Sequence, residues 1–382
     1  MLPVGAPEYR AGVPDWRKQL EQMLRAGVDA ADPETLVANH LRLRSPLPGH
    51  DQIVVLAVGK AAASMARGAA QILGARARGL AVCPAAVNLP GFDVVVGDHP
   101  IPGSGSFQAG HRLMDAAAAA GPGDLVLVLL SGGASAMAEV PAPGVSEQQI
   151  ADVNSSLLVS GQPISQINQR RSSLSALKGG GLTAAARPAR VVTLAISDVV
   201  DASSDVIGSG PSTGSDVFEV LADGSTAARG AARACLEAGL EPEVSGRPIT
   251  GPASEAGSRL GGASRELGNR AALVGFGETT VLVDGPGRGG RNQELALAAA
   301  LEIANTNALV GSIDTDGIDG PTGNAGAIVD GTTTDRGTAL GLDAAKHLAA
   351  HDSATFLEAV GDVVVTGPTG TNVGDLIVAI KP

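Results

Sequence analysis

Short apolar runs alternate with helical patterns along most of this chain. The runs "QIVVLAVG", "DLVLVLLSGG" and "ARVVTLAISD" are apolar at nearly every position before they turn polar. Strands that are buried on both faces have this composition, whereas a strand with one solvated face alternates between apolar and polar residues. Because helical segments separate the runs, the sequence predicts an α/β fold in which helices cover both faces of a parallel sheet.

Helical patterns fill the intervals between these runs. Residues 16–43 are predicted to form a helix that restarts at Pro33, since proline is favoured in the first turn of a helix. Further helices are expected over 60–73, from near Ser106 to 120, over 146–161 and over 165–182. The last of these is expected to stop at a run of glycines.

The amino-acid composition of the chain changes near Gly246. A stretch rich in Pro, Gly and Ser follows this residue, and the chain of 382 residues is long enough for two domains. We therefore expect one domain over 1–246 and a smaller α/β domain over 247–382. In the second domain, 270–304 predicts two strands, a glycine loop and a helix, and 327–341 predicts a turn that leads into a helix.

Composition and charge narrow the class of protein. Hydrophobic residues make up 44% of the chain and charged residues 17%, which is typical of a globular protein with a large core. The net charge of −12 comes without a basic run, which argues against a nucleic-acid partner. No apolar run approaches the length of a membrane span, and the N-terminus lacks the pattern of a signal peptide. Cys83 and Cys235 are expected to be free thiols, so we expect a cytoplasmic protein.

The segment "AVGKAAASMARGAA" places Lys60 where a strand gives way to a helix. It is not a P-loop, because Val54 occupies the position of the first glycine and Ala61 the position of the hydroxyl residue. It does not match the dinucleotide motif G-x-G-x-x-G either. A lysine at a helix N-terminus suits a phosphate group, and it equally suits a solvated helix start.

Other loops rich in Gly, Ser and Asp follow the predicted strands, where sheet enzymes bind their ligands. "LLSGGASA" carries Ser131 and Ser135 and reads either as an anion-binding loop or as a tight turn. Asp198 follows the next strand and reads as a metal ligand, a proton acceptor or a cap. The loop "SIDTDGIDGPTG" offers Asp316 and Asp319 as metal or substrate ligands, with Asp-Gly turn chemistry as the alternative.

The loop "GPGRGGRNQELAL" presents Arg288 and Arg291 just before a predicted helix. Arginine is a planar, permanently charged group that matches phosphate oxygens. Two arginines at the positive end of a helix dipole repel it unless an anion lies there, which favours a bound phosphate. Glu294 can instead neutralise one of the arginines.

Taken together, these loops resemble those of the class II glycerate 2-kinases. The matching motifs are "VGKAAASMA", "LSGGASA", "LSALKGGGL", "SDVVDASSDVIGSGP", "GGRNQELALAAAL", "TDGIDGPTGNAGAIVDGTT" and "TGPTGTNVGDL", which extend from about Trp16 to Ile380. The resemblance implies a Rossmann-like domain, a smaller MOFRL domain and an active site in the cleft between them. It also implies phosphorylation of D-glycerate to 2-phospho-D-glycerate by ATP with Mg²⁺, and leaves a homodimer open.

The resemblance also implies roles for particular residues. Lys60 and Arg291 match catalytic residues of the family, and Asp198 is the third candidate. Mg²⁺ is expected at Asp198, Asp316 or Asp319, while Lys60 and Arg171 are expected to bind the substrate. The residues expected to bind the nucleotide are Ser131, Gly132, Gly133, Ser135, Gly289, Gly290, Asn292, Glu294, Thr369 and Asn372.

Three motifs depart from the family pattern. Ser172 and Ser173 replace a Lys-His pair, "SGGASAMA" replaces S-G-G-G-S-A-L-L, and Gly323 replaces an aspartate. These changes remove charges that can touch a carboxylate or a metal, so a kinase for a related hydroxy acid is an alternative. A nicotinamide-dependent hydroxypyruvate reductase and a binding protein without activity are two further alternatives.

Overall fold

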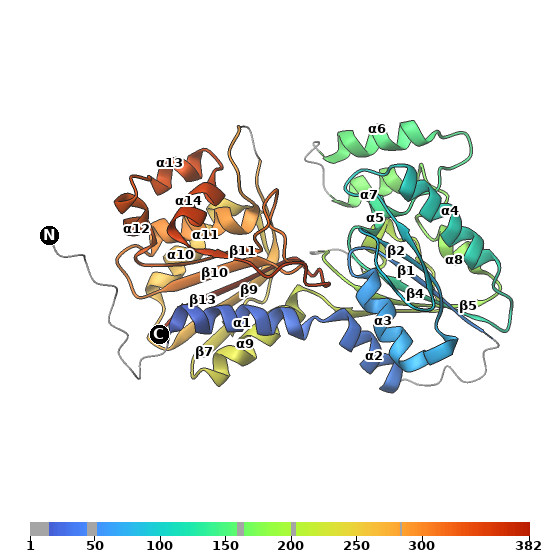
Figure 1. Cartoon of the computed structure of the whole chain (residues 1–382), viewed down its shortest axis with the longest axis horizontal. Coiled ribbons are helices and arrows are strands. Elements are labelled where there is room, and N and C mark those ends of the chain that lie inside the picture. Colours follow the sequence, from blue (N-terminus) through green and yellow to red (C-terminus); the bar gives the residue numbers. More distant parts are fainter. Residues whose placement is uncertain (1–14, 44–51, 159–163, 200–203, 283–284) are drawn as a thin grey trace.

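The protein consists of two α/β domains, seen side by side in the computed structural model of Figure 1. The structure describes residues 15–43, 52–158, 164–199, 204–282 and 285–382. Among these residues, no helix is both long enough and apolar enough to cross a lipid bilayer. Each domain contains a β-sheet covered by helices, which confirms the predicted α/β fold. The two sheets differ in how their strands are arranged.

The first sheet is entirely parallel, with the strand order β3-β2-β1-β4-β5-β6. Its strands are β1 (Ile53–Val58), β2 (Arg78–Cys83), β3 (Phe92–Val96), β4 (Leu125–Leu130), β5 (Arg190–Ile196) and β6 (Val217–Ala222). The chain begins in the middle, builds outward to β3, and then returns to build the other half from β4. This is the Rossmann order, and β1 and β4 flank its switch point, outside which ligands bind.

Helices cover both faces of this sheet because each central strand is apolar on both sides. Val55 and Ala57 face a core shared with α2 (Pro33–Leu43) and α3 (Ala62–Leu73). Leu56 and Val58 face the opposite core, shared with α4 (Ser104–Ala118) and α8 (Gly181–Ala186). Every residue of β4 is buried, which explains its unbroken apolar sequence.

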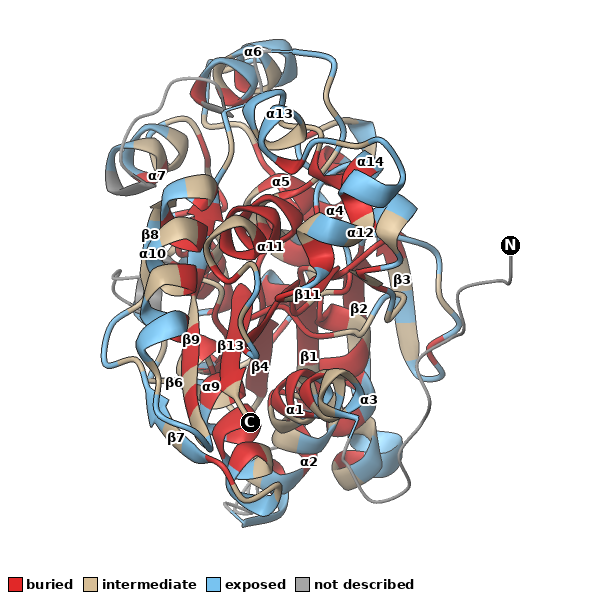
Figure 2. Cartoon of the chain, turned by 90° about the vertical axis from the view of Figure 1, so that its left-hand side faces the viewer, coloured by how far each residue is buried: buried red, intermediate tan, exposed pale blue. Residues whose placement is uncertain are grey.

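The second sheet is mixed, with the order β12-β11-β10-β13-β9-β7 and β8 paired to β9. Only β7 and β8 run parallel to β9, and the remaining pairs are antiparallel. Its strands are β7 (Glu241–Val244), β8 (Ile249–Pro252), β9 (Ala271–Thr280), β10 (Leu309–Asp314), β11 (Gly326–Asp330), β12 (Val363–Val364) and β13 (Asp375–Lys381). Helices α10 (Ala253–Glu266) and α11 (Arg291–Glu302) cover one face, and buried residues line both sheets in Figure 2.

The other face of the second sheet is covered by helices that come from the N-terminal side of Gly246. These are α1 (Trp16–Ala30) and α9 (Gly224–Glu237), which pack closely against each other. A Cβ on Gly230 would lie 2.4 Å from the Cβ of Ala30, so only glycine allows this approach. The boundary after Gly246 stays a prediction; we propose that the second body starts at α9 and includes α1.

Three expected elements differ from the structure. The helix expected over 165–182 ends early: α7 (Ile164–Ser172) stops before Ser175, which forms a β-bridge with Pro141 and so has left the helix. Gly179 and Gly180, with positive φ angles, then separate these turns from α8. The two strands expected after 270 form the single strand β9. The turn expected at 327–341 is wrong at its start, where β11 pairs with β10.

Shorter elements and turns connect these units. They include α5 (Ala134–Met137), α6 (Glu147–Leu158), the 3₁₀ segments η1 (Gly74–Arg76) and η2 (Ser204–Ser209), α12 (Thr333–Ala339), α13 (Ala344–Ala349) and α14 (Ser353–Val360). Cys83 and Cys235 are free, as expected, and burial raises the pKa of each thiol to about 11. Both thiols are therefore protonated and unreactive at neutral pH.

Candidate active site

The loops after β1 and β4 meet at the switch point of the first sheet. The backbone N–H of Lys60 donates to the carbonyl of Gly132 at 2.9 Å, and the N–H of Ala61 donates to Ser131 Oγ at 3.0 Å. Gly59 has a φ of 120°, and a Cβ on it would come within 2.4 Å of Ser131 Oγ. The glycine before Lys60 thus serves this close loop packing, and the buried Ser131 hydroxyl supports the start of α3.

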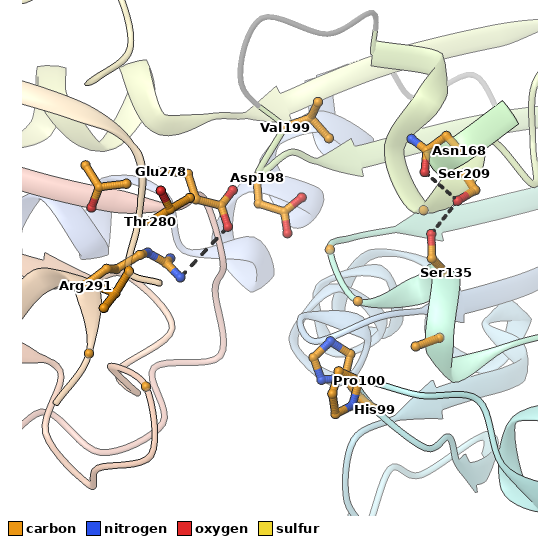
Figure 3. A pocket seen from close by; sticks show the side chains of 18 of the residues that line it. His99, Pro100, Ser135, Asn168, Asp198, Val199, Ser209, Glu278, Thr280 and Arg291 are labelled. Atoms are coloured by element: carbon orange, nitrogen blue, oxygen red, sulfur yellow. Dashed lines mark hydrogen bonds and ion pairs between the residues drawn. The ribbon is translucent and has the colours of Figure 1, made fainter. Parts of the chain in front are cut away.

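A cleft of about 770 Å³ opens between the two domains at this point. One wall comes from the first domain and the other from β9 and the start of α11, and side chains from both sides point into the space (Figure 3). Several residues predicted to bind a nucleotide or substrate lie on its lining. They are Gly132, Gly133, Ser135, Arg171, Asp198, Gly289, Gly290 and Arg291.

Lys60 crosses the gap between the domains at the edge of this lining. Its Nζ lies 2.7 Å from Asp316 Oδ2 in the second domain. Burial by itself lowers the pKa of Lys60, but the carboxylate of Asp316 outweighs it and raises the pKa above its usual value. Lys60 is therefore a fixed positive charge that is paired across the cleft, and it is not a solvated residue at a helix start.

Arg291 is the first residue of α11 and faces the cleft from the other domain (Figure 3). Its Nε donates to Asp375 Oδ1 at 2.7 Å, and its Nη2 donates to Asp314 Oδ2 at 2.7 Å. Burial opposes the charge, but these carboxylates raise the pKa of Arg291 further above its ordinary value. The guanidinium is thus held rigidly, with one edge of the fork turned toward Glu278.

The neighbouring arginine has a different role from the one expected. Arg288 pairs with Glu358 on the surface, and Nη1 lies 3.0 Å from Oε1 of that residue. Asp319 supplies a carboxylate at the positive end of α11. The bound anion expected at this helix stays a prediction, because a carboxylate of the protein already meets part of the electrostatic demand there.

Asp319 caps helix α11. Its Oδ1 accepts from the N–H of Asn292 at 3.0 Å and its Oδ2 accepts from the N–H of Gln293 at 2.8 Å. Both contacts satisfy donors that the helix itself leaves free. Burial raises the pKa of this carboxyl to about 6. Its role as a metal ligand stays a prediction, and the geometry favours the cap.

Five residues expected to bind the nucleotide lie away from the lining of the cleft. Asn292 is fully buried and donates to Asp375, and Glu294 pairs with His351 instead of with an arginine. Thr369 donates to the carbonyl of Thr315 at 2.6 Å and borders a separate hollow of about 290 Å³. The other two are Ser131, which supports the start of α3, and Asn372, which donates to Asp198.

Asp198 lies at the centre of the cleft and is tied to the other domain. Asn372 Nδ2 donates to Asp198 Oδ2 at 2.8 Å. Gly132 makes room for this pair, since a Cβ there would come within 1.9 Å of Asp198 Oδ2. Burial raises the pKa of Asp198, while the charges of Lys60 and Arg291 oppose the rise. The charges of both cations therefore act on the carboxylate of Asp198, although the two cations belong to different domains.

Comparison with known proteins identifies this arrangement. Residues 19–236 match a family model described as a domain of unknown function (DUF4147), and residues 271–375 match the MOFRL family. A D-glycerate 2-kinase of Thermotoga maritima is 35% identical over 95% of this chain and 98% of its own length. The chain belongs to the class II glycerate 2-kinase family.

Two further similarities describe this glycerate 2-kinase family member. A protein of Agrobacterium vitis that is provisionally named hydroxypyruvate reductase is 34% identical over 94% of this chain and 93% of its own length. The crystal structure of a glycerate kinase from Thermotoga maritima superposes with a TM-score of 0.88 at 32% identity, covering 96% of this chain and 99% of that one. The fold of this chain is thus the two-domain fold of the family.

The kinase-family cleft also contains residues that the sequence analysis missed. Glu278 at the end of β9 and His99 after β3 both line it, together with Asn168, Ser209 and Thr280. Burial, aided by Asp198 and Asp375 and opposed by Arg291, raises the pKa of Glu278 to about 7. Burial and the charge of Lys60 lower the pKa of His99. The rule that polar residues at strand ends carry function points to the positions of Glu278 and His99, but it does not distinguish them from other polar residues at strand ends.

Ser172, Ser173 and Gly323 depart from the kinase-family pattern and are not among the residues that line the cleft. Arg171 keeps its place on the lining, and burial lowers its pKa below the usual value for arginine. The hydroxyl of Ser173 donates to the carbonyl of Arg170 at 2.8 Å and is exposed. A Cβ on Gly323 would meet no atom within 4 Å. A side chain therefore fits at Gly323 without rearrangement.

The carboxylates of the cleft are suitable ligands for Mg²⁺ of the kind the family implies. Among the residues that the structure describes, no three His, Cys, Asp or Glu side chains converge into a metal cage. A kinase does not require one, because Mg²⁺ takes one or two carboxylates and completes its shell with phosphates and water. Asp198 and Asp316 fit this pattern, since each lies next to a cation that would bind the same phosphates.

Proposed function

We propose that this protein transfers the γ-phosphoryl group of ATP to the 2-hydroxyl of D-glycerate. The observation that carries the proposal is that Lys60 and Arg291, from different domains, bind carboxylates at the end of β10 and in the loop that follows it: Lys60 Nζ lies 2.7 Å from Asp316 Oδ2, and Arg291 Nη2 lies 2.7 Å from Asp314 Oδ2. Phosphoryl transfer needs positioned positive charge more than covalent chemistry, and this arrangement supplies it. Membership of the glycerate 2-kinase family supports the choice of substrate.

Each part of the cleft has a task in this reaction. The hydroxyl oxygen of glycerate attacks the γ-phosphorus as the bond to the ADP oxygen breaks. Lys60 and Arg291 stabilise the charge on the transferring oxygens, and Asp198 and Asp316 would hold Mg²⁺, which shields the nucleotide phosphates. Glu278 would accept the hydroxyl proton, because a base with a pKa near 7 is half ionised at neutral pH. Arg171 would bind the glycerate carboxylate.

The nucleotide phosphates would lie against the glycine-lined surfaces of both domains. Gly132 and Gly133 allow close approach from the first domain, and Gly289 and Gly290 do so from the second. A reductase is the weaker proposal, since no G-x-G-x-x-G follows a strand of the first sheet. The cytoplasm as location and the homodimer stay predictions.

The decisive experiment measures ADP release over a panel of small hydroxy acids, with the position of the phosphate read by phosphorus NMR. We expect turnover with D-glycerate and a phosphate at carbon 2. Oxidation of NADH with hydroxypyruvate, in the absence of ADP release, would replace this proposal with the reductase. Binding of D-glycerate without either reaction would indicate a binding protein.

A further inference from the structure

Three polar side chains form a hydrogen-bonded chain along the first-domain wall of the cleft. Ser135 Oγ lies 2.7 Å from Ser209 Oγ, and Ser209 Oγ donates to Asn168 Oδ1 at 2.9 Å. All three residues line the cleft, and they come from α5, η2 and α7. The contacts, drawn as dashed lines in Figure 3, tie three separate segments to one point.

The single hydroxyl proton of Ser209 sets the direction of this chain. Because Ser209 gives its proton to Asn168 Oδ1, Ser135 must be the donor in the contact between the two serines. Two consequences follow at the ends. Within the described ranges of the chain, Asn168 Nδ2 keeps both of its N–H groups for other partners, and Ser135 Oγ offers only lone pairs. This hydrogen-bonded chain of Ser135, Ser209 and Asn168, called the relay below, therefore presents donors at one end and an acceptor at the other.

The backbone of Ser209 is unusual for a residue with a side chain. Its φ is 64°, in the left-handed region, and its neighbours Gly208 and Gly210 have φ angles of 62° and 65°. Glycine is favoured in this conformation, so a buried serine between two glycines is retained at a cost. The carbonyl of Ser209 accepts from the N–H of Gly179 at 3.2 Å, and this hydrogen bond holds the backbone in place. The need for a hydroxyl group at this position explains why a serine, and not a glycine, occupies it.

Arg171 places a positive charge beside this donor end. It follows Asn168 by three residues on α7, so the two side chains share one face of the helix. Its Nε donates a hydrogen bond to Asn154 Oδ1 at 2.8 Å. Within the described parts of the chain, no carboxylate lies within ion-pair distance of its guanidinium. The positive charge of Arg171 and the N–H groups of Asn168 together suit the carboxylate of a ligand. The lone pairs of Ser135 Oγ can accept from a hydroxyl group of the same ligand.

We propose that Ser209 is a positioning residue that fixes the Asn168 amide with its N–H groups toward the cleft, where Asn168 and Arg171 bind the carboxylate of a 2-hydroxy acid. The inference rests on the proposed function and names the part of the cleft that selects an acid over a neutral alcohol. Ser209 itself does not touch the substrate. It acts through Asn168 and Ser135.

The test uses the full chain and two variants. Ser209→Gly removes the hydroxyl and also relieves the backbone strain, so loss of folding does not confound it. We expect the KM for D-glycerate to rise about tenfold while kcat and the KM for ATP stay within about twofold. Asn168→Asp replaces the donors with a negative charge and should also abolish the preference for D-glycerate over its neutral amide, D-glyceramide. Ser156→Ala, an exposed serine on α6, is the matched control.

The outcomes separate the relay from the reaction. An unchanged KM for D-glycerate in Ser209→Gly, or a rise in the KM for ATP alone, would overturn the inference. Calorimetric titration of D-glycerate into each protein gives the same comparison without turnover. If the wild type binds D-glycerate but transfers no phosphate, the proposed function fails, and weaker binding by Ser209→Gly still supports the relay.

Discussion

At the scale of single residues, the cleft separates groups with fixed charge from groups that titrate. Carboxylates raise the pKa values of Lys60 and Arg291, so both stay charged at any physiological pH. Burial raises the pKa of Glu278 to about 7 and raises that of Asp198 above its usual value. Permanent cations suit the stabilisation of a phosphoryl group, whereas a carboxylate with a raised pKa suits proton transfer.

The first prediction concerns Lys60. Lys60→Ala should lower kcat for ATP-dependent turnover by ~10³-fold or more, since a positioned cation at the transferring phosphate carries much of the catalysis. The fold should persist, because the side chain is partly exposed and its partner Asp316 can be solvated. Steady-state ADP release and a circular dichroism melt measure the two effects. Lys346→Ala, at an exposed lysine, is the control, and near-normal turnover of Lys60→Ala would contradict the assignment.

The second prediction concerns the pH dependence of the reaction. Glu278 accepts a proton only when it is ionised, and its pKa is about 7, so kcat should rise between pH 6 and pH 8 and then level off as this group loses its proton. Glu278→Gln should abolish this limb and slow the reaction by about 10²-fold or more.

A pH–rate profile of both proteins checks this expectation. Glu266→Gln, which alters an exposed carboxylate of α10, should keep the wild-type profile. An acid limb that survives in Glu278→Gln would assign the proton transfer to another group, with Asp198 as the next candidate.

At the scale of elements, helix α11 organises the second wall of the site. Its first residue is Arg291, and the cap from Asp319 fixes the direction in which the helix starts. Gly290 is required beside this cap, since a Cβ there would lie 2.3 Å from Asp319 Oδ1. Gly290 therefore serves the packing of the cap.

The third prediction concerns this cap. Asp319→Ala should lower the free energy of unfolding by about 2 kcal/mol, because two buried N–H groups lose their acceptor. Urea unfolding at neutral pH measures the change. Asp343→Ala removes the cap of α13 at an exposed position and should cost less. An unchanged unfolding midpoint in Asp319→Ala, together with a higher Mg²⁺ requirement, would support the metal role instead.

At the scale of the whole molecule, the chain passes back and forth between the domains. Helix α1 packs on the second sheet, α2 to β6 build the first domain, and α9 returns to the second (Figure 1). Contacts across the cleft reinforce this exchange, with Lys60 bonded to Asp316 and Asn372 bonded to Asp198. The site is thus assembled only when both domains are in place.

The fourth prediction tests the division into domains. A fragment of residues 247–382 should not unfold cooperatively, because the face of its sheet that α1 and α9 cover would be exposed to water. Leu20, Met23 and Leu24 of α1 are fully buried on this face, and each contributes about 1.5–3 kcal/mol by its burial. A fragment of residues 224–382 joined to 15–31 through a flexible linker should show a cooperative thermal transition. Cooperative unfolding of 247–382 alone would restore the boundary at Gly246.

The sequence determined the local features of this protein. The apolar runs gave the strands of the first sheet, because strands buried on both faces admit only apolar residues. The position of Lys60 after a strand and of Arg291 before a helix was likewise readable, since both depend on neighbours in the chain. The ordered motifs determined the family, which comparison confirmed.

The tertiary structure decided what depends on contacts between distant segments. Whether a polar side chain caps a helix, pairs with another residue or faces a cleft cannot be read from its neighbours. Asp319 and Asp198 both follow strands, yet one caps α11 and the other faces Lys60 and Arg291. The same holds for Glu278, whose raised pKa comes from burial in the assembled protein. Electrostatics and desolvation act through space, so they appear only when the two domains come together.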